Sequence, residues 1–289
     1  MRKFVIITVI TSAIFLISYN IRKVKSIAKK NQFCPEKIVS LMVGLDEITY
    51  QVARNKLTGV SYLSFNPKIS NISSKLQNVK PLKVEINSLL NTKPDLILFS
   101  KFSNTNLINV IINQGIRVEF FDRFNSLTDI EDNIKRIANI TCQPHSGKKL
   151  IKWINRIKNR LRRRCKKVKN KLRTIFISLN LMSAGERTIV SDILELACLK
   201  NIIKENGLSL FPQLKLEDIL RYNPDIIILD DWIDIESFFA RYVSLKKLKA
   251  YQHKRIVQIE NKLIMATSHY SFLTAYILFN RIYRKPQPQ

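Results

Sequence analysis

Side chains suited to a large anionic ligand follow the predicted strands in both halves of the chain. In parallel α/β sheets, ligands bind beyond the carboxyl ends of the strands. Aromatic side chains at these ends can form walls for a flat ligand, and basic ones can pair with anionic oxygens. The candidate binding residues are Tyr62, Ser64, Lys101, Phe102, Arg123, Arg187, Trp232, His269 and Tyr270. For each, the alternative is an ordinary loop residue, because loops tolerate many side chains.

His269 is the candidate that can bind a metal through a ring nitrogen. It could be an axial ligand to haem iron or to cobalt, and the alternative is a histidine at a helix N-terminus without a metal. A site for free zinc or manganese needs several converging histidines or carboxylates. The three histidines, His145, His253 and His269, lie far apart in the sequence. We therefore expect no site for a free metal ion and no cofactor of the protein's own.

Common catalytic and nucleotide-binding signatures are absent from the sequence. The six glycines are too widely spaced for GxGxxG, GxSxG or a P-loop, and the four cysteines lack CxxC spacing. These absences remove the usual dinucleotide, hydrolase and structural-zinc motifs. We also find no nucleophile–base pair. The sequence favours a binding protein over its alternative, an enzyme on a two-lobed fold.

The excess of basic residues is concentrated in two segments. The formal net charge is +27, from 49 basic and 22 acidic residues. Residues 1–30 carry seven Lys or Arg and residues 148–173 carry fourteen, without an acid in either, which leaves 28 basic against 22 acidic elsewhere. No nucleic-acid-reading motif accompanies the basic residues, so we expect no nucleic-acid partner. The basic stretch is interpreted as a solvated helix face, with an anionic membrane surface as the alternative partner.

Residues 1–20 have the pattern of a signal peptide. Met1-Arg2-Lys3 precedes an apolar run, 4–18, which contains no charge. This run is shorter than the roughly 20 residues of a membrane-spanning helix. No A-x-A cleavage site follows, so the run could also remain as an anchor. We expect export to the periplasm, where the four cysteines can form disulfides in any of three pairings.

Apolar, β-branched runs alternate with amphipathic patterns from residue 35 onward. Strands are expected at 37–42, 60–63, 95–99 and 116–121, and helices near 45–56, 86–92 and 104–113. This alternation is typical of a parallel sheet with helices on its faces.

One pattern, a short helix followed by Pro-Asp and an apolar strand, occurs twice. It contains Pro94-Asp95 and, 130 residues later, Pro224-Asp225. Proline ends the preceding helix, and the aspartate is expected to accept local backbone hydrogen bonds in the turn. A repeat at the same point of the series predicts two lobes of one architecture. We assign the N-terminal α/β lobe to 35–146 and the C-terminal α/β lobe to 173–285.

A long basic amphipathic helix is predicted between the lobes, at 147–172. Its apolar residues recur at steps of three or four: Leu150, Ile154, Ile157, Leu161, Cys165, Val168 and Leu172. At 1.5 Å per residue, about 25 residues would span about 35–40 Å. We therefore predict two Rossmann-like lobes with parallel sheets, joined by a single long α-helix, with the ligand cleft between the lobes.

The order and spacing of these segments resemble the substrate-binding proteins of bacterial ABC importers for cobalamin, ferric siderophores and haem. The resemblance runs from about residue 35 to 283 and is carried by segments 37–41, 46–50, 115–118, 184–188, 216–220, 223–225 and 255–257, together with LLNTKPDLILFS. It implies a monomer that catalyses nothing, with a metal chelate, an ABC permease and its ATPase as partners. A ferric siderophore is the first choice, because Lys101, Arg123 and Arg187 suit an anionic chelate; cobalamin and haem follow.

The resemblance also implies residues that dock on the permease. In that family an acidic residue, seven before the proline of each Pro-Asp strand, is exposed at the tip of each lobe. Glu217 matches this position in the second lobe. In the first lobe Asn87 occupies it, with Glu85 two residues earlier. Docking by the first lobe is therefore assigned to Glu85 or Asn87.

Overall fold

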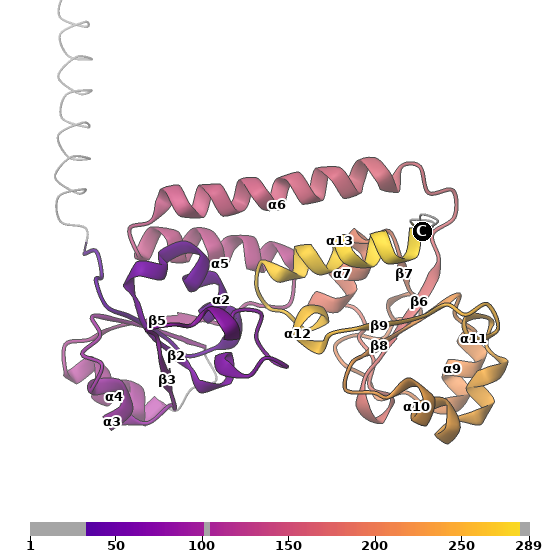
Figure 1. The fold of residues 1–289 in the computed structure, drawn as a ribbon, viewed down its shortest axis with the longest axis horizontal. Coiled ribbons are helices and arrows are strands. Elements are labelled where there is room, and N and C mark those ends of the chain that lie inside the picture. The colour runs from indigo at the N-terminus through magenta and orange to yellow at the C-terminus, as the bar shows by residue number, and fades with distance from the viewer. Residues whose placement is uncertain (1–32, 101–104, 284–289) are drawn as a thin grey trace, which may run out of the picture. The chain divides into compact units, whose positions relative to one another are not determined.

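The computed structural model describes residues 33–100 and 105–283. The chain divides into two units, 1–34 and 35–289. The described residues of the second unit form two α/β lobes joined by a long helix (Figure 1). The predicted signal peptide, 1–20, with its apolar run 4–18, lies outside the described residues.

The N-terminal lobe contains a five-stranded parallel sheet of order β3-β2-β1-β4-β5. Its strands are β1 (Ile38–Ser40), β2 (Leu57–Ser61), β3 (Lys80–Leu82), β4 (Leu96–Ser100) and β5 (Arg117–Phe121). Its helices are α2 (Val43–Ala53), α3 (Ile86–Leu90), α4 (Thr105–Asn113) and α5 (Leu127–Ile140). The apolar residues of β1 and β4 are buried, as expected for parallel strands covered on both faces.

The C-terminal lobe repeats this arrangement with a four-stranded parallel sheet of order β7-β6-β8-β9. Its strands are β6 (Arg173–Ile177), β7 (Lys200–Asn201), β8 (Ile226–Asp230) and β9 (Ile256–Ile259). Its helices are α7 (Ile189–Leu196), α8 (Ile202–Glu205), α9 (Leu216–Tyr222), α10 (Ile235–Arg241), α11 (Lys249–Gln252), α12 (Asn261–Ile264) and α13 (Tyr270–Tyr283). The order matches β2-β1-β4-β5 of the first sheet, without a counterpart of β3. The predicted two-lobed fold with parallel sheets is confirmed.

The two Pro-Asp turns have the same mechanical role in both lobes. The carboxylate of Asp95 accepts hydrogen bonds from the backbone N–H groups of Glu36 (2.9 Å) and Lys37 (2.8 Å). The carboxylate of Asp225 accepts one from the N–H of Arg173 (2.9 Å). These bonds reach the start of the neighbouring strand, β1 or β6, instead of staying within the turn as the sequence suggests. Each aspartate therefore ties the start of its strand to the central strand of its sheet.

The bridging helix α6 (Pro144–Cys165) has 22 residues and different bounds from the predicted 147–172. Proline is tolerated in the first turn of a helix, because the backbone N–H that it lacks would have no intrahelical acceptor there. Gly147 does not start the helix but lies inside it, where an added Cβ would come within 2.3 Å of the Ala138 Cβ on α5. Val168 and Leu172 follow the helix and still pack against the core, which explains why the apolar periodicity continues beyond its end.

A disulfide fixes the C-terminal end of α6 to the C-terminal lobe. Cys165 is bonded to Cys198, with the Cα atoms 5.6 Å apart, and no cysteine among the described residues is free. The sequence left three pairings open because it does not show which cysteines meet in space.

Candidate functional site

The carboxyl ends of the two sheets face each other. Residues 66–71 follow β2, and Lys262 follows β9. The amide of Asn71 donates to the Lys262 carbonyl (2.9 Å), and the Lys262 ammonium donates to the Pro67 carbonyl (3.1 Å). Ligands of parallel α/β sheets bind at such edges, so the region between the lobes is the candidate site.

Three of the predicted binding residues are exposed at these edges. Tyr62 begins the 3-10 turn after β2, and its side chain is 52% exposed. Trp232 follows β8 and is 48% exposed. Arg187 precedes α7 and is also exposed. These side chains can therefore contact a ligand from either lobe.

Further large apolar side chains are exposed in the same loops: Leu63, Leu179, Met182, Leu210 and Phe211. Residues 208–213 lie beside 182–186 through backbone bridges that pair Met182 with Gln213 and Glu186 with Ser209. Leu210 and Phe211 were not predicted from the sequence, because they precede Pro212 in a segment without helical or strand periodicity. The sequence feature that could have identified them is the occurrence of two consecutive large apolar residues in a segment without periodicity.

Several loop residues of the C-terminal lobe have left-handed backbone conformations. The φ angles are +57° at Asn180 and Leu181, +60° at Arg187 and +58° at Leu210. Such conformations are unfavourable for residues with a side chain, and they concentrate at functional sites. Their position next to the exposed apolar side chains supports a binding role for these loops.

Ser64 does not line the cleft. Its side chain is buried, and its hydroxyl donates to Oδ2 of Asp46 (2.7 Å), which also accepts from the Ser61 N–H (3.0 Å). Burial raises the pKa of Asp46 to about 8, against the opposing effect of these hydrogen bonds. Ser64 and Asp46 thus support the turn that carries Tyr62.

The three predicted cations have different surroundings. Lys101, like the aromatic candidate Phe102, lies outside the described residues. Arg123 is exposed and forms ion pairs with Asp129 (3.9 Å) and Asp132 (3.8 Å). Arg187 donates to the Ser209 hydroxyl (3.2 Å), and no carboxylate in the described part of the chain pairs with it. Among the described cations of this set, Arg187 is the one available to an anionic ligand.

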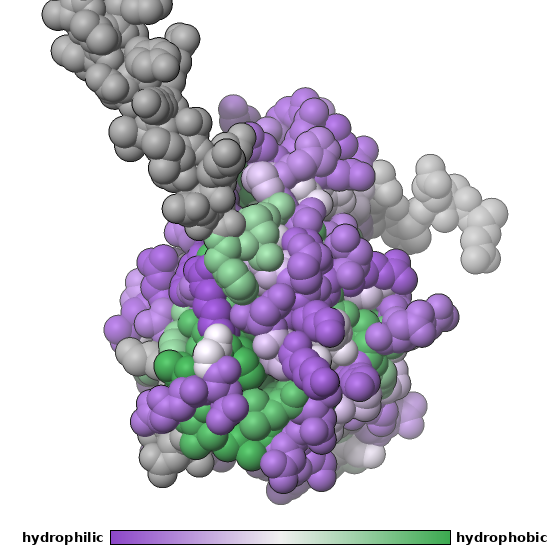
Figure 2. Space-filling model, turned by 90° about the vertical axis from the view of Figure 1, so that its left-hand side faces the viewer, coloured by the Kyte–Doolittle hydropathy of each residue, from purple (hydrophilic) through white to green (hydrophobic). Residues whose placement is uncertain are grey.

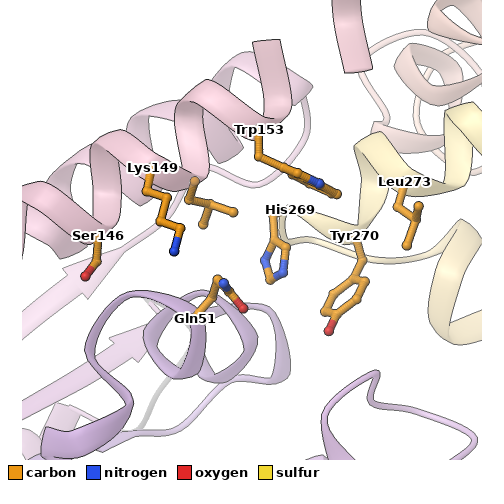
Figure 3. A pocket seen from close by; sticks show the side chains of 8 residues that line it. Gln51, Ser146, Lys149, Trp153, His269, Tyr270 and Leu273 are labelled. Atoms are coloured by element: carbon orange, nitrogen blue, oxygen red, sulfur yellow. The ribbon is translucent and has the colours of Figure 1, made fainter. Parts of the chain in front are cut away.

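His269 and Tyr270 are separated from the other candidates. They lie at the start of α13 and line a cavity with residues of α2 and α6 (Figure 3). His269 is only 5% exposed, with its ring 6.1 Å from that of Trp153 and 4.3 Å from that of Tyr270. Burial, and secondarily the charge of Lys75, lowers the pKa of His269 to about 3. Such burial argues against an axial bond to a chelate held between the lobes.

The predicted docking residues are exposed at the starts of two helices. Glu85 is the N-cap residue of α3, Asn87 lies in its first turn, and Glu217 lies in the first turn of α9. Neither glutamate has an ion-pair partner among the described residues. Figure 1 places α3 and α9 away from α6 in their lobes, and Figure 2 shows apolar surface low on the N-terminal lobe. Val84, beside Glu85, is among the exposed apolar residues.

The described residues contain neither a metal cluster nor a membrane-spanning helix. Within 33–100 and 105–283, no three His, Cys, Asp or Glu side chains come together in a way that could hold a metal ion. No helix in the same ranges has both the length and the apolar character needed to cross a bilayer.

Comparison with known proteins relates most of the two-lobed region to one family. Residues 23–263 match the family model described as periplasmic binding protein. The uncharacterized ABC transporter substrate-binding lipoprotein YvrC of Bacillus subtilis (strain 168) is 23% identical over 239 residues, which cover 80% of this chain and 74% of that protein.

Solved structures agree with this relation at the level of the fold. The periplasmic heme binding protein HutB of Vibrio cholerae superposes with a TM-score of 0.74 at 19% identity, covering 86% of this chain and 98% of that one. The periplasmic vitamin B12 binding protein BtuF of Vibrio cholerae gives a TM-score of 0.68 at 18% identity, covering 87% and 98%. These likenesses confirm the predicted architecture of two parallel-sheet lobes.

Proposed function

This chain belongs to the periplasmic binding protein family, and we propose that it captures a metal chelate between its lobes and delivers it to an ABC importer. In this role the protein binds and releases its ligand without catalysis, and the ATPase of the importer supplies the energy. We further propose that the chain is exported to the periplasm, with residues 1–20 acting as a signal peptide or with the apolar run 4–18 retained as an anchor.

The observation that carries this proposal is the apolar surface on two facing sheet edges. Tyr62 and Leu63 extend from the N-terminal lobe, and Trp232 and Phe211 are exposed in the C-terminal lobe. Exposed apolar patches mark ligand-binding surfaces, and sites of this kind combine apolar walls with a few polar groups. A large, flat chelate offers matching apolar faces.

The geometry changes the order in which we rank the chelates. The preference for a ferric siderophore rested on three cations, of which Arg123 is partly neutralised by carboxylates and Lys101 is not described. Exposed aromatic and aliphatic side chains suit a porphyrin better than a hydrophilic siderophore. A phenol oxygen can also be an axial ligand to haem iron, which makes Tyr62 the candidate ligand, with Arg187 available to a propionate. We therefore propose haem first, then cobalamin, then a ferric siderophore.

Titration of the purified protein with haem, cyanocobalamin and a ferric siderophore tests this ranking. We expect haem to bind with a dissociation constant of roughly micromolar or below, with a shifted haem absorption band, because axial ligation perturbs the porphyrin. Tyr62→Phe should weaken binding and change that spectrum. Tyr276→Phe on α13, whose hydroxyl contacts Arg160, is the matched control and should behave as wild type. Failure of all three chelates to bind would contradict the proposed function.

For delivery, we propose that Glu85 and Glu217 dock on the permease. Both carboxylates are exposed at the start of the helix that precedes a Pro-Asp strand, one in each lobe. Neither forms an ion pair with a described residue, so both remain available to cations of a partner.

A further inference from the structure

A cavity lies among α2, α6 and α13, apart from the facing sheet edges. Its volume is about 420 Å³, which is within the range of small-molecule sites. The residues that line it are Gln51, Ser146, Lys149, Leu150, Trp153, His269, Tyr270 and Leu273. None of the exposed residues of the cleft is among them. Its walls come from the N-terminal lobe, the bridging helix and the C-terminal helix.

Among the polar residues that line this cavity, His269 is the buried one. His269 is about nineteen-twentieths buried, and its Nδ1 has no hydrogen-bond partner among the described residues. The imidazole is neutral at physiological pH, because its burial lowers the pKa to about 3. A neutral imidazole carries one N–H donor and one acceptor nitrogen. Nδ1 has almost no accessible surface, so it is enclosed by protein atoms, and His269 contributes its neutral ring to the wall of the cavity.

Positive charge is present beside His269. Lys149 and Gln51 point toward His269 from α6 and α2 in Figure 3. Lys75 lies nearby, with its ammonium 3.4 Å from the Tyr270 hydroxyl. The acidic neighbour, Glu47, is already engaged: it accepts hydrogen bonds from the Ser268 hydroxyl and from Asn71. The remaining polar groups therefore favour an anion.

The other walls are apolar. The Trp153 indole, Leu150 and Leu273 line the cavity as well. We propose that this cavity binds a small aromatic carboxylate, whose ring packs against Trp153 and Leu273 while its carboxylate accepts hydrogen bonds from Lys149. This site is independent of the chelate cleft.

Binding of 2-naphthoate to the full chain tests the proposal, with the uncharged 2-naphthalenemethanol for comparison. By calorimetry, we expect wild type to bind the carboxylate and to bind the alcohol at least roughly tenfold more weakly, because charge-assisted hydrogen bonds are lost. Lys149→Met should weaken binding of 2-naphthoate by roughly tenfold. Lys152→Met is the matched control, since Lys152 is exposed on the same helix but does not line the cavity.

Two further variants locate the ligand. Trp153→Ala removes the aromatic wall of this cavity and should also weaken binding; a thermal melt checks that the change leaves the protein folded. Trp232→Ala removes an aromatic wall of the cleft and should leave 2-naphthoate binding unchanged. The proposal is overturned if the carboxylate does not bind, if Lys149→Met and Lys152→Met bind it equally, or if Trp232→Ala abolishes binding, which would place it in the cleft. Chelate binding is measured in a separate titration, so the result with 2-naphthoate neither supports nor contradicts the proposed function.

Discussion

At the scale of single residues, Asp46 connects the first turn of α2 to the loop that carries Tyr62. Its side chain is fully buried, and its carboxyl group accepts hydrogen bonds from Ser64, from the Ser61 N–H and, at 3.3 Å, from the Met42 N–H. Burial nevertheless dominates and raises its pKa from 3.8 to about 8. The folded protein therefore holds a proton that the unfolded chain releases between these two values.

This difference predicts how stability changes with pH. Between pH 4 and 8 the unfolded state binds fewer protons at Asp46, so the free energy of unfolding falls as pH rises, by at most about 1.4 kcal/mol per pH unit. Asp46→Asn cannot ionise and should lose this component. Urea denaturation at pH 5, 6, 7 and 8 measures the difference between wild type and variant, which isolates Asp46 from the opposite effect of His269 below pH 6.5.

Asp132→Asn is the control, because Asp132 lies on the exposed part of α5. Its stability should follow the wild-type pH profile. Parallel profiles for wild type and Asp46→Asn would contradict the assignment of a protonated Asp46 to the folded state.

Sequence reasoning placed Tyr62 and Trp232 after strands, where the structure has them, but it could not assign the environments of the candidate residues. Tyr62 and Trp232 follow strands, and their exposure agrees with the prediction. Ser64 also follows a strand, yet it is buried because Asp46, eighteen residues earlier, needs a donor. The surroundings of His269 depend on α2 and α6, which are distant in sequence, so local pattern could not reveal them.

At the scale of elements, α3 and α9 present the carboxylates that we assign to permease docking. Glu217→Ala should leave chelate affinity unchanged and weaken association with the permease roughly tenfold, because a charged contact across an interface is removed. The measurement is binding of the loaded protein to proteoliposomes that contain its permease. The adjacent Asp218→Ala is a matched control, since Asp218 already pairs with Arg221 at 2.7 Å.

Loss of chelate affinity with normal permease association in Glu217→Ala would contradict this docking role. If Asp218→Ala weakened association with the permease equally, the negative charge at this end of α9, and not the position of Glu217, would determine that association.

The regular elements were predictable where hydrophobic periodicity was strong, as in β4, β5 and α6. Strand β3 was missed because it has three residues and contains Pro81, which a sheet accepts only at an edge. The end of α6 was misplaced because Val168 and Leu172 pack on the core without being helical. Hydrophobic periodicity indicates which residues are buried on one face, but it does not by itself determine the backbone conformation of those residues.

At the scale of the whole two-lobed unit, the lobes are connected by more than the bridging helix. One hydrophobic core includes residues of β1, α6, α7 and α13. The Leu127 N–H donates to Asp192 (2.9 Å), and the Ser268 hydroxyl donates to Glu47. The sequence indicated two lobes and a helix between them. It could not show these added connections, because they join residues 65 and 221 positions apart.

Substitution of the two tryptophans of the chain tests whether a chelate binds between the facing sheet edges. Trp232 is exposed at the cleft, whereas Trp153 lines the separate cavity beside α6. For the chelate that binds wild type best, equilibrium titration should show affinity weakened roughly tenfold or more in Trp232→Ala, as for a central aromatic contact, and unchanged affinity in folded Trp153→Ala. Unchanged affinity in Trp232→Ala together with a loss in Trp153→Ala would contradict binding of the chelate between these edges.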